Sequence, residues 1–149
     1  MKADKKKPKE SLGKSPDGSW AGDKSLNVVL EQRLPIWQSI SEFYLDTELQ
    51  PHDYNSITRT FLDSDLSLNE LKAIDRYEVL PVLKANLINT LGEWRGFDET
   101  WLSEECTKRY LKRNNRWFRW KIQFYDYFLF SMRKDHWAEI ENRMKDASN

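Results

Sequence analysis

Hydrophobic residues recur at three- and four-residue steps along most of the chain from residue 25 to residue 146. This is the spacing of one buried face of an α-helix. In Ser25–Asp46 the pattern predicts a short helix before Pro35 and a stronger helix from about Pro35 to Leu45. The break is expected because a proline inside a helix kinks it or begins a new one.

Two further helix starts are marked by their side chains. Proline suits the first position of a helix over Pro51–Leu62, and the aspartate in its first turn favours the helix dipole. Ser67 and Glu70 have the spacing of a capping box, in which each satisfies a free backbone N–H of the other's turn. This box predicts a helix over Ser67–Leu80.

The next apolar stretch lies between two helix-breaking residues. Pro81 is expected to end or bend the preceding helix, Val82–Leu91 continues helically, and Gly92 stops it. Asp98 is then placed to cap a helix over Glu99–Arg113. The acid at its start and the cations at its end agree with the helix dipole.

The stretch Trp117–Met144 fits two patterns. Its first residues, Phe118–Phe124, alternate apolar and polar positions as a strand does, so a short strand or hairpin near residues 107–125 is one interpretation. The length of the stretch favours a helix instead, and Asp135–Met144 is helical by its pattern.

As a helix, this stretch would have two apolar stripes and one mixed face. The stripes are Trp117, Trp120, Phe124 and Phe128, and Phe118, Ile122, Tyr125, Leu129 and Met132. We expect the third face to be an exposed partner surface, polar with two exposed rings. Its residues are Arg119, Gln123, Asp126, Phe130, Arg133 and Trp137.

Together the patterns predict a single, compact, mainly α domain of five to seven helices over residues 25–146. Residues 1–24 are rich in lysine and have almost no apolar side chain before Trp20. Such a segment cannot bury enough surface to offset its ordering entropy, so we expect a disordered basic tail. The tail is either simply solvated or a basic arm for nucleic acid or an acidic partner.

Composition narrows the classes of protein. The 24 basic and 24 acidic residues cancel, which argues against a general nucleic-acid coat but not against local basic patches. Cys106 is the only cysteine, which excludes internal disulfides and cysteine-based zinc sites. No apolar run approaches the ~20 residues that span a bilayer, and none follows the N-terminal lysines as in a signal peptide. We therefore expect a cytoplasmic protein that does not contact membranes.

Several sequence blocks resemble a family of small bacterial proteins with a domain of unknown function. The blocks are LPIW, FYLDTEL, SLNEL, EVLPVL and GEWRGFDETWL, which begin at residues 34, 43, 67, 78 and 92. The resemblance implies a helical fold and, because the family has no established activity, no catalytic residues. It runs from Arg33 to Leu102 and leaves the lysine tail and everything after Leu102 outside.

Side chains suited to catalysis are sparse. His52 and His136 are the only histidines, and they lie in no recognisable motif and lack metal-ligand spacing. Cys106 lies on an apolar helical face, where a buried thiol is expected. No phosphate-binding glycine loop occurs. We expect no bound metal, no cofactor and no enzyme activity.

Carboxylates are the remaining catalytic resource. Asp46, Glu48, Glu93 and Asp98 lie in the blocks that carry the resemblance, and together they would suit a carboxylate-based hydrolase. We favour structural roles for them. Asp98 caps a helix, Glu93 pairs with a nearby arginine, and Asp46 and Glu48 hold a loop.

The segment Lys108–Lys121 is the strongest local signal of binding. It has seven basic residues, four interleaved rings and no acid among its cations, as in grooves that bind single-stranded nucleic acid. The partner site predicted on this basis consists of Lys112, Arg113, Arg116, Arg119, Phe130 and Trp137. The competing interpretation is internal neutralisation, since Glu42–Glu78 has nine acids against three cations, a formal balance of −6. The rings would then belong to the core.

These observations favour a non-catalytic bacterial protein-interaction domain. One form of it is an immunity or antitoxin protein that neutralises a cognate toxin by charge-complementary docking. The predicted docking face for a basic toxin is acidic and consists of Asp46, Glu48, Asp53, Asp63 and Asp65. The alternatives are a nucleic-acid-binding protein that uses residues 108–121 and the carboxylate-based hydrolase.

Overall fold

The computed structural model describes Pro16, residues 24–88 and residues 97–149, with only the backbone described for residues 85–88. Every regular element in these ranges is helical. The elements are α1 (Lys24–Ser41), the 3₁₀ turn η1 (Glu42–Tyr44), α2 (Pro51–Asp63), α3 (Leu68–Ile74), the π-helical turn η2 (Asp75–Val79), α4 (Leu80–Ile88), α5 (Glu99–Lys112), α6 (Arg116–Leu129), the 3₁₀ turn η3 (Phe130–Met132) and α7 (Lys134–Ala147). The predicted mainly α domain is confirmed. Residues 107–125 lie in α5, α6 and the turn between them, so the hairpin interpretation is wrong.

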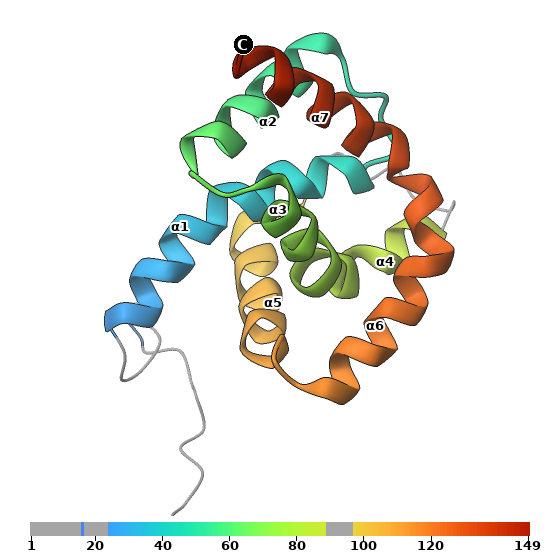
Figure 1. The fold of residues 1–149 in the computed structure, drawn as a ribbon. Helices are drawn as coiled ribbons and strands as arrows, with labels where there is room; N and C mark the ends of the chain where they lie inside the picture. The colour runs from blue at the N-terminus through green and yellow to red at the C-terminus, as the bar shows by residue number, and fades with distance from the viewer. Residues whose placement is uncertain (1–15, 17–23, 89–96) are drawn as a thin grey trace, which may run out of the picture.

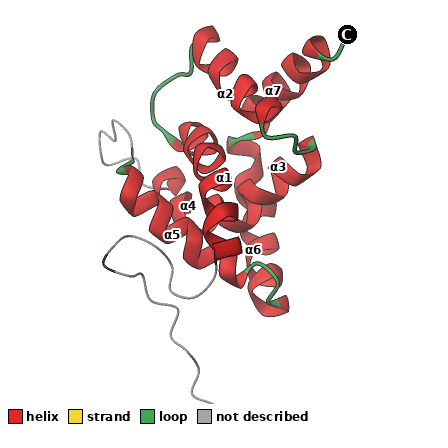
Figure 2. Ribbon diagram, turned by 90° about the vertical axis from the view of Figure 1, so that its left-hand side faces the viewer, coloured by secondary structure: helices red, strands yellow, loops and turns green. Residues whose placement is uncertain are grey.

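The run from α3 through η2 to α4 lies at the centre of the domain (Figure 1). The turn η2 contacts α1, α3, α4, α5 and α6. Helices α2 and α7 pack side by side at one end, and α6 covers a second side of the central run (Figures 1 and 2). The predicted tail lies outside the described residues except for Pro16 and Lys24, as does the predicted stop at Gly92.

A buried arginine joins three of these elements. Arg133, which lies between η3 and α7, is 1% exposed, and its Nε donates to Asp75 Oδ2 at 2.9 Å. Its Nη2 donates to Asp126 Oδ1 of α6 at 2.6 Å. The Nε1 of Trp137 and the hydroxyl of Tyr44 also donate to the Asp75 carboxylate. Every charge in this cluster is therefore paired with another, which is the condition under which buried charges are tolerated.

This arrangement overturns the expected exposure for part of the third face of Trp117–Met144, whereas Arg119 and Gln123 are exposed as expected. Asp126, Arg133 and Trp137 are buried, and Phe130 packs against the core half-buried. Trp137 stacks on Phe61 with ring centres 5.8 Å apart. Trp137 cannot contact a partner in this structure. The part of the face from Asp126 onwards points inward because Arg133 pairs with both Asp126 and Asp75.

Pro35 does not divide the first helix, and the predicted break there is wrong. Helix α1 runs through it without interruption. The residues on either side, Arg33 and Trp37, both bind Glu78 of η2: Arg33 Nη1 lies 3.0 Å from Oε1 and Trp37 Nε1 lies 2.7 Å from Oε2. Contacts with the Glu78 carboxylate thus hold the helix together on both sides of the proline. The proline costs the helix one backbone hydrogen bond, because its nitrogen has no N–H to donate.

Pro81 likewise does not end the helical run. It lies in α4, immediately after the π-helical turn, in which the N–H of Leu80 donates to the carbonyl of Asp75. The wider turn changes the hydrogen-bond register just before the proline, so the helical run continues through it. The predicted stop at Pro81 is wrong for this reason.

Side chains cap the starts of α2, α3 and α5. Ser67 N donates to Glu70 Oε2 at 2.9 Å and Glu70 N donates to Ser67 Oγ, which confirms the predicted capping box. The predicted cap by Asp98 is also confirmed, since its carboxylate accepts from Trp101 N at 2.7 Å. Asp53 accepts from Gln50 N at 2.8 Å at the start of α2.

Replacing Arg133 with Met should lower the free energy of unfolding by about 3–5 kcal/mol, because Asp75 and Asp126 stay buried without their cation. Urea unfolding followed by circular dichroism measures this. Arg143→Met is the matched control. Arg143 pairs with Glu139 on a partly exposed surface, and its loss should cost less than about 1 kcal/mol. Equal losses in the two variants would contradict the role given to Arg133.

The unfolding free energy should also depend on His136. Burial lowers the pKa of this imidazole below its ordinary value of 6.5, although Asp135 opposes the shift. The unfolded chain then binds a proton at a higher pH than the folded chain does. Stability should therefore fall as the pH drops from 6.5 towards the lower pKa of the folded state.

His136→Gln removes this titration and keeps a polar partner for the Tyr54 hydroxyl, which lies 2.7 Å from Nδ1. Urea unfolding at several pH values between about 7.5 and about 5 should show a flatter dependence in the variant than in the wild type. An unchanged dependence would mean that other groups dominate this range.

Candidate functional site

Helix α6 packs on the domain by one face only. Its start is capped by Asn115, whose side chain accepts from Phe118 N at 3.1 Å. Ile122 and Asp126 are buried, and their neighbours on this side are half-buried against the core. These neighbours are Phe118, Tyr125 and Leu129. The stripe with aliphatic side chains is thus the one that faces inward.

The opposite face of α6 is aromatic and exposed. Trp117 is 79% exposed, Trp120 66%, Phe124 58%, Tyr127 82% and Phe128 61%. We call these five residues, with Met132 beyond them, the aromatic ridge. The sequence did not indicate that this stripe would be left in water. The neutralisation hypothesis placed the rings of residues 108–121 in the core, which is wrong for Trp117 and Trp120, whereas Tyr110 is buried.

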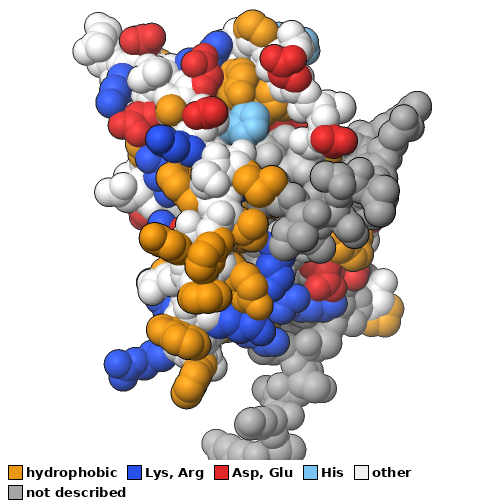
Figure 3. All heavy atoms as spheres, turned by 90° about the vertical axis from the view of Figure 1, so that its right-hand side faces the viewer, with side chains coloured by type: hydrophobic (Ala, Val, Ile, Leu, Met, Phe, Trp, Pro, Cys, Tyr) orange, Lys and Arg blue, Asp and Glu red, His pale blue; other side chains and the backbone are white. Residues whose placement is uncertain are grey.

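The rings of the ridge pack against one another. Trp117 and Trp120 meet edge to face with centres 6.0 Å apart, and Phe124 and Phe128 do so at 5.0 Å. Tyr127 contacts Phe128 at 5.3 Å. On the face of the molecule formed by this side, hydrophobic side chains gather in a continuous patch with Lys and Arg side chains beside it (Figure 3). The ridge is therefore a continuous apolar surface with defined ring geometry.

The basic segment around the start of α6 is only partly neutralised. Lys108 pairs with Glu105, one turn earlier in α5, and Arg109 lies 3.9 Å from the same carboxylate. In the ranges that the structure describes, the remaining cations of the segment have no carboxylate partner. They are Lys112, Arg113, Arg116, Arg119 and Lys121. Direct ion pairs with the acidic half do not reach these five side chains in the described ranges, although the charge of Arg113 opposes the raised pKa of the buried Glu78.

The five residues of the predicted acidic face lie in two groups, one near each end of α2. Asp46, Glu48 and Asp53 lie before or at the start of α2, whereas Asp63 and Asp65 lie at its end. A helix of 13 residues is about 20 Å long, so the two groups are well separated. The two groups of acids thus lie about one helix length apart, and their role as a docking face stays a prediction.

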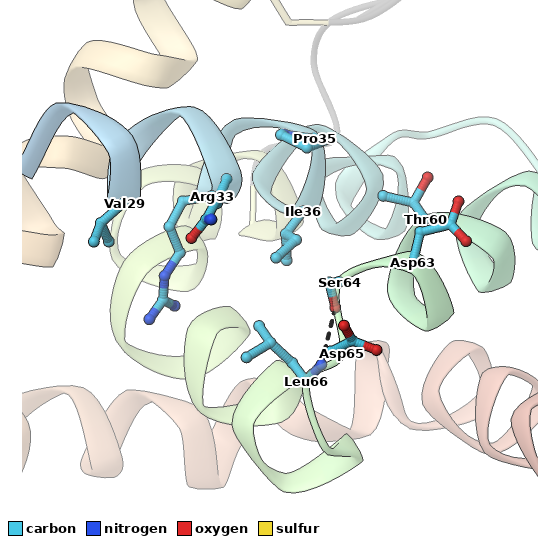
Figure 4. Close-up of a pocket in the computed structure, with 10 residues that line it drawn as sticks. Val29, Arg33, Pro35, Ile36, Thr60, Asp63, Ser64, Asp65 and Leu66 are labelled. Carbon is cyan, nitrogen blue, oxygen red and sulfur yellow. Dashed lines mark hydrogen bonds between the residues drawn. The ribbon is translucent and has the colours of Figure 1, made fainter. Parts of the chain in front are cut away.

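A cavity of about 610 Å³ lies between α1 and the loop that joins α2 to α3. Arg33 enters it from α1, and Asp63 and Asp65 line the opposite side (Figure 4). Its hydroxyl groups already have acceptors: Thr60 Oγ1 donates to the Ser56 carbonyl, and Ser64 Oγ to the Phe61 carbonyl. The lining includes no cysteine or histidine, so the cavity offers neither a thiol nor an imidazole.

Two other catalytic candidates, Cys106 and Asp98, have structural roles in the fold. Cys106 is fully buried, and burial raises the pKa of its thiol well above the ordinary range, with Glu78 adding to the effect. Asp98 is a helix cap, and Glu93 lies outside the described residues. Where side chains are described, no cluster of three or more His, Cys, Asp or Glu residues is suited to a metal ion. None of the described helices is both long and apolar enough to cross a bilayer.

The chain belongs to the family described as a domain of unknown function, DUF7079, whose model matches residues 31–143. The match extends well beyond Leu102, so the resemblance seen in the sequence stopped too early. Helix α6 and the aromatic ridge lie inside the family domain. No curated protein and no solved structure matches the chain.

Cys106 should react with a thiol reagent such as DTNB only after unfolding, because its sulfur is inaccessible and its pKa is raised. Native protein should show no measurable labelling, and protein in denaturant should release one thiol equivalent per chain. A Cys106→Ala chain that also has Ser148→Cys, at an exposed position, is the positive control. Fast labelling of the native wild type would return Cys106 to the list of candidate nucleophiles.

Proposed function

We propose that this member of a family of unknown function is a non-catalytic protein-interaction domain that binds its partner through the aromatic ridge of α6. The exposed ridge is the observation that carries the proposal. Large apolar rings left in water are unfavourable for an isolated domain, and contiguous exposed patches of this kind mark interaction surfaces. Aromatic residues are also the side chains that most often dominate binding energy at interfaces.

The size of the ridge suits a protein partner. Rings of this kind present roughly 150–250 Å² each, so five that are more than half exposed offer on the order of 700 Å². A stable interface buries about 800 Å² on each partner. The distance along α6 from Trp117 to Phe128 is about 17 Å at 1.5 Å per residue. The ridge therefore matches a hydrophobic groove that accepts three turns of helix.

The cations beside the ridge indicate which charges the partner has and where they lie. Arg116 and Lys121 lie on either side of the ridge near its tryptophans, whereas no cation occurs from Ile122 to Met132. We infer a partner with a hydrophobic groove and acidic residues beside the end that receives Trp117 and Trp120. Such charges would steer the encounter and fix the orientation of docking.

Single-stranded nucleic acid is the second candidate partner. The exposure of Trp117 and Trp120 between Arg116 and Lys121 favours it, because bases stack on rings along a basic surface. Two observations favour a protein. The rings contact each other edge to face, and α6 itself supplies no cation from Phe124 to Met132 to neutralise a phosphate backbone.

Neutralisation of a toxin is the biological form of this function that we propose, in a bacterial setting. The hypothesis rests on the lack of a catalytic constellation among the described residues and on the exposed aromatic face of α6. The partner surface moves from the acidic residues to the ridge, so the partner is expected to have an acidic rather than a basic rim. Asp63 and Asp65 remain available as a second, smaller contact.

The double variant Trp120→Ala with Phe124→Ala should weaken binding of the partner by about a hundredfold or more, because central aromatic anchors at interfaces are each worth about 2 kcal/mol or more. The partner is captured from nuclease-treated lysate, identified, and its affinity is then measured by calorimetry. Val28→Ala, which removes an exposed apolar side chain on α1, is the control and should bind as the wild type does.

The same variants distinguish the two candidate partners. If the chain binds a single-stranded oligonucleotide with a steep dependence on salt, and no protein is captured after nuclease treatment, the second candidate replaces the first. If the double variant and Val28→Ala bind a captured protein equally well, the ridge is not the interface and the proposal fails.

A further inference from the structure

Three arginines converge on a small cavity away from the aromatic ridge. The cavity is about 210 Å³ and lies between α1, the run from α3 to η2, and the turn from α5 to α6. Arg33 contributes from α1, Arg113 from the turn and Arg119 from the first turn of α6. No residue of the aromatic ridge lines it.

Two of the guanidinium groups lie over tyrosine rings. The guanidinium carbon of Arg113 lies 3.6 Å from the centre of the Tyr110 ring, and that of Arg119 lies 4.2 Å from the centre of the Tyr77 ring. The guanidinium carbon of Arg33 lies 5.3 Å from the centre of the same Tyr110 ring. Stacking fixes the plane of a guanidinium group and leaves its N–H edge free to donate.

The hydrogen bonds of Arg113 and Arg119 use only backbone acceptors. Arg113 Nη1 donates to the Tyr110 carbonyl at 3.0 Å, and Arg119 Nη1 donates to the Arg113 carbonyl at 3.4 Å. Neither side chain forms an ion pair with a carboxylate in the described ranges. Each guanidinium group has five N–H donors, so most of its donors are unused by these contacts.

The acids of the cavity have other partners. Glu78 is buried, and its carboxylate accepts from Arg33 and from Trp37 Nε1. Burial raises the pKa of Glu78, against the opposing charges of Arg33 and Arg113. Glu70 accepts from the backbone N–H and hydroxyl of Ser67 in the capping box. The charges of Arg113 and Arg119 are thus left without a direct counter-ion.

We propose that Arg113 and Arg119, with Arg33 behind them, form a binding site for a tetrahedral oxyanion, which is inorganic phosphate or the terminal phosphate of a small monoester. Planar guanidinium forks are the side chains best matched to phosphate oxygens. The cavity is below the ~300 Å³ at which pockets for drug-sized ligands begin. It therefore suits a phosphate group and not a whole nucleotide.

The test uses the full chain and inorganic phosphate as the probe. Phosphate is titrated at constant ionic strength, and amide shifts are followed by ¹H–¹⁵N NMR. We expect saturable shifts at residues 113–119. Arg119→Gln should weaken binding by about tenfold or more, because one charged hydrogen bond is worth about 1.5–3 kcal/mol. Arg113→Gln should act in the same direction.

Arg116→Gln is the matched control, since Arg116 is an exposed arginine in the same helix that does not line the cavity. It should leave the affinity unchanged. Arg119→Lys keeps the charge but loses the fork, and it should bind phosphate more weakly than the wild type. O-phosphoserine added in competition distinguishes a free ion from a monoester, because only an open site accepts the larger molecule.

Two results would overturn the proposal: no saturable shift in the wild type, or an affinity that Arg116→Gln lowers as much as Arg119→Gln does. The site is independent of the proposed protein-interaction function. Loss of phosphate binding with normal partner binding, or the reverse, separates the two.

Discussion

The buried Arg133 holds the arrangement of the domain. Its guanidinium bridges carboxylates from η2 and α6, and neither acid could remain desolvated without it. This pairing fixes the rotation of α6 about its own axis, because Asp126 must face Arg133. Positions 120, 124 and 128 then lie on the far side of a helix with 3.6 residues per turn. The aromatic face is thus turned to solvent by the same charges that hold the helix in place.

The π-helical turn lets two nearby buried carboxylates bind different parts of the domain. It buries Asp75 and Glu78 within four residues of one another, yet each carboxylate binds a different part of the domain. Glu78 holds α1 through Arg33 and Trp37, on both sides of Pro35. That contact also places Arg33 at the edge of two neighbouring cavities. A change in the turn would therefore reach both the core and the surface sites.

Local signals predicted much of this fold. The capping box at Ser67 and the cap at Asp98 were readable because their hydrogen bonds join residues three apart. The continuity of α1 through Pro35 was not, since it depends on Glu78, which lies 41 residues from Trp37. The exposure of the aromatic ridge could not be predicted from local signals either. Two apolar stripes compete for one buried face, and the choice is made by Asp75 and Arg133, which are 58 residues apart.

The ridge also has a consequence for the free protein in solution. The formal net charge of the whole chain is zero at neutral pH, so long-range repulsion between copies of the protein is weak. Exposed rings on such a particle promote self-association when the chain is concentrated. A bound partner would cover the rings and act as a solubilising subunit. The colloidal behaviour of this domain would then be a property of the complex, and the amount of free chain a cell can hold would be set by the supply of its partner.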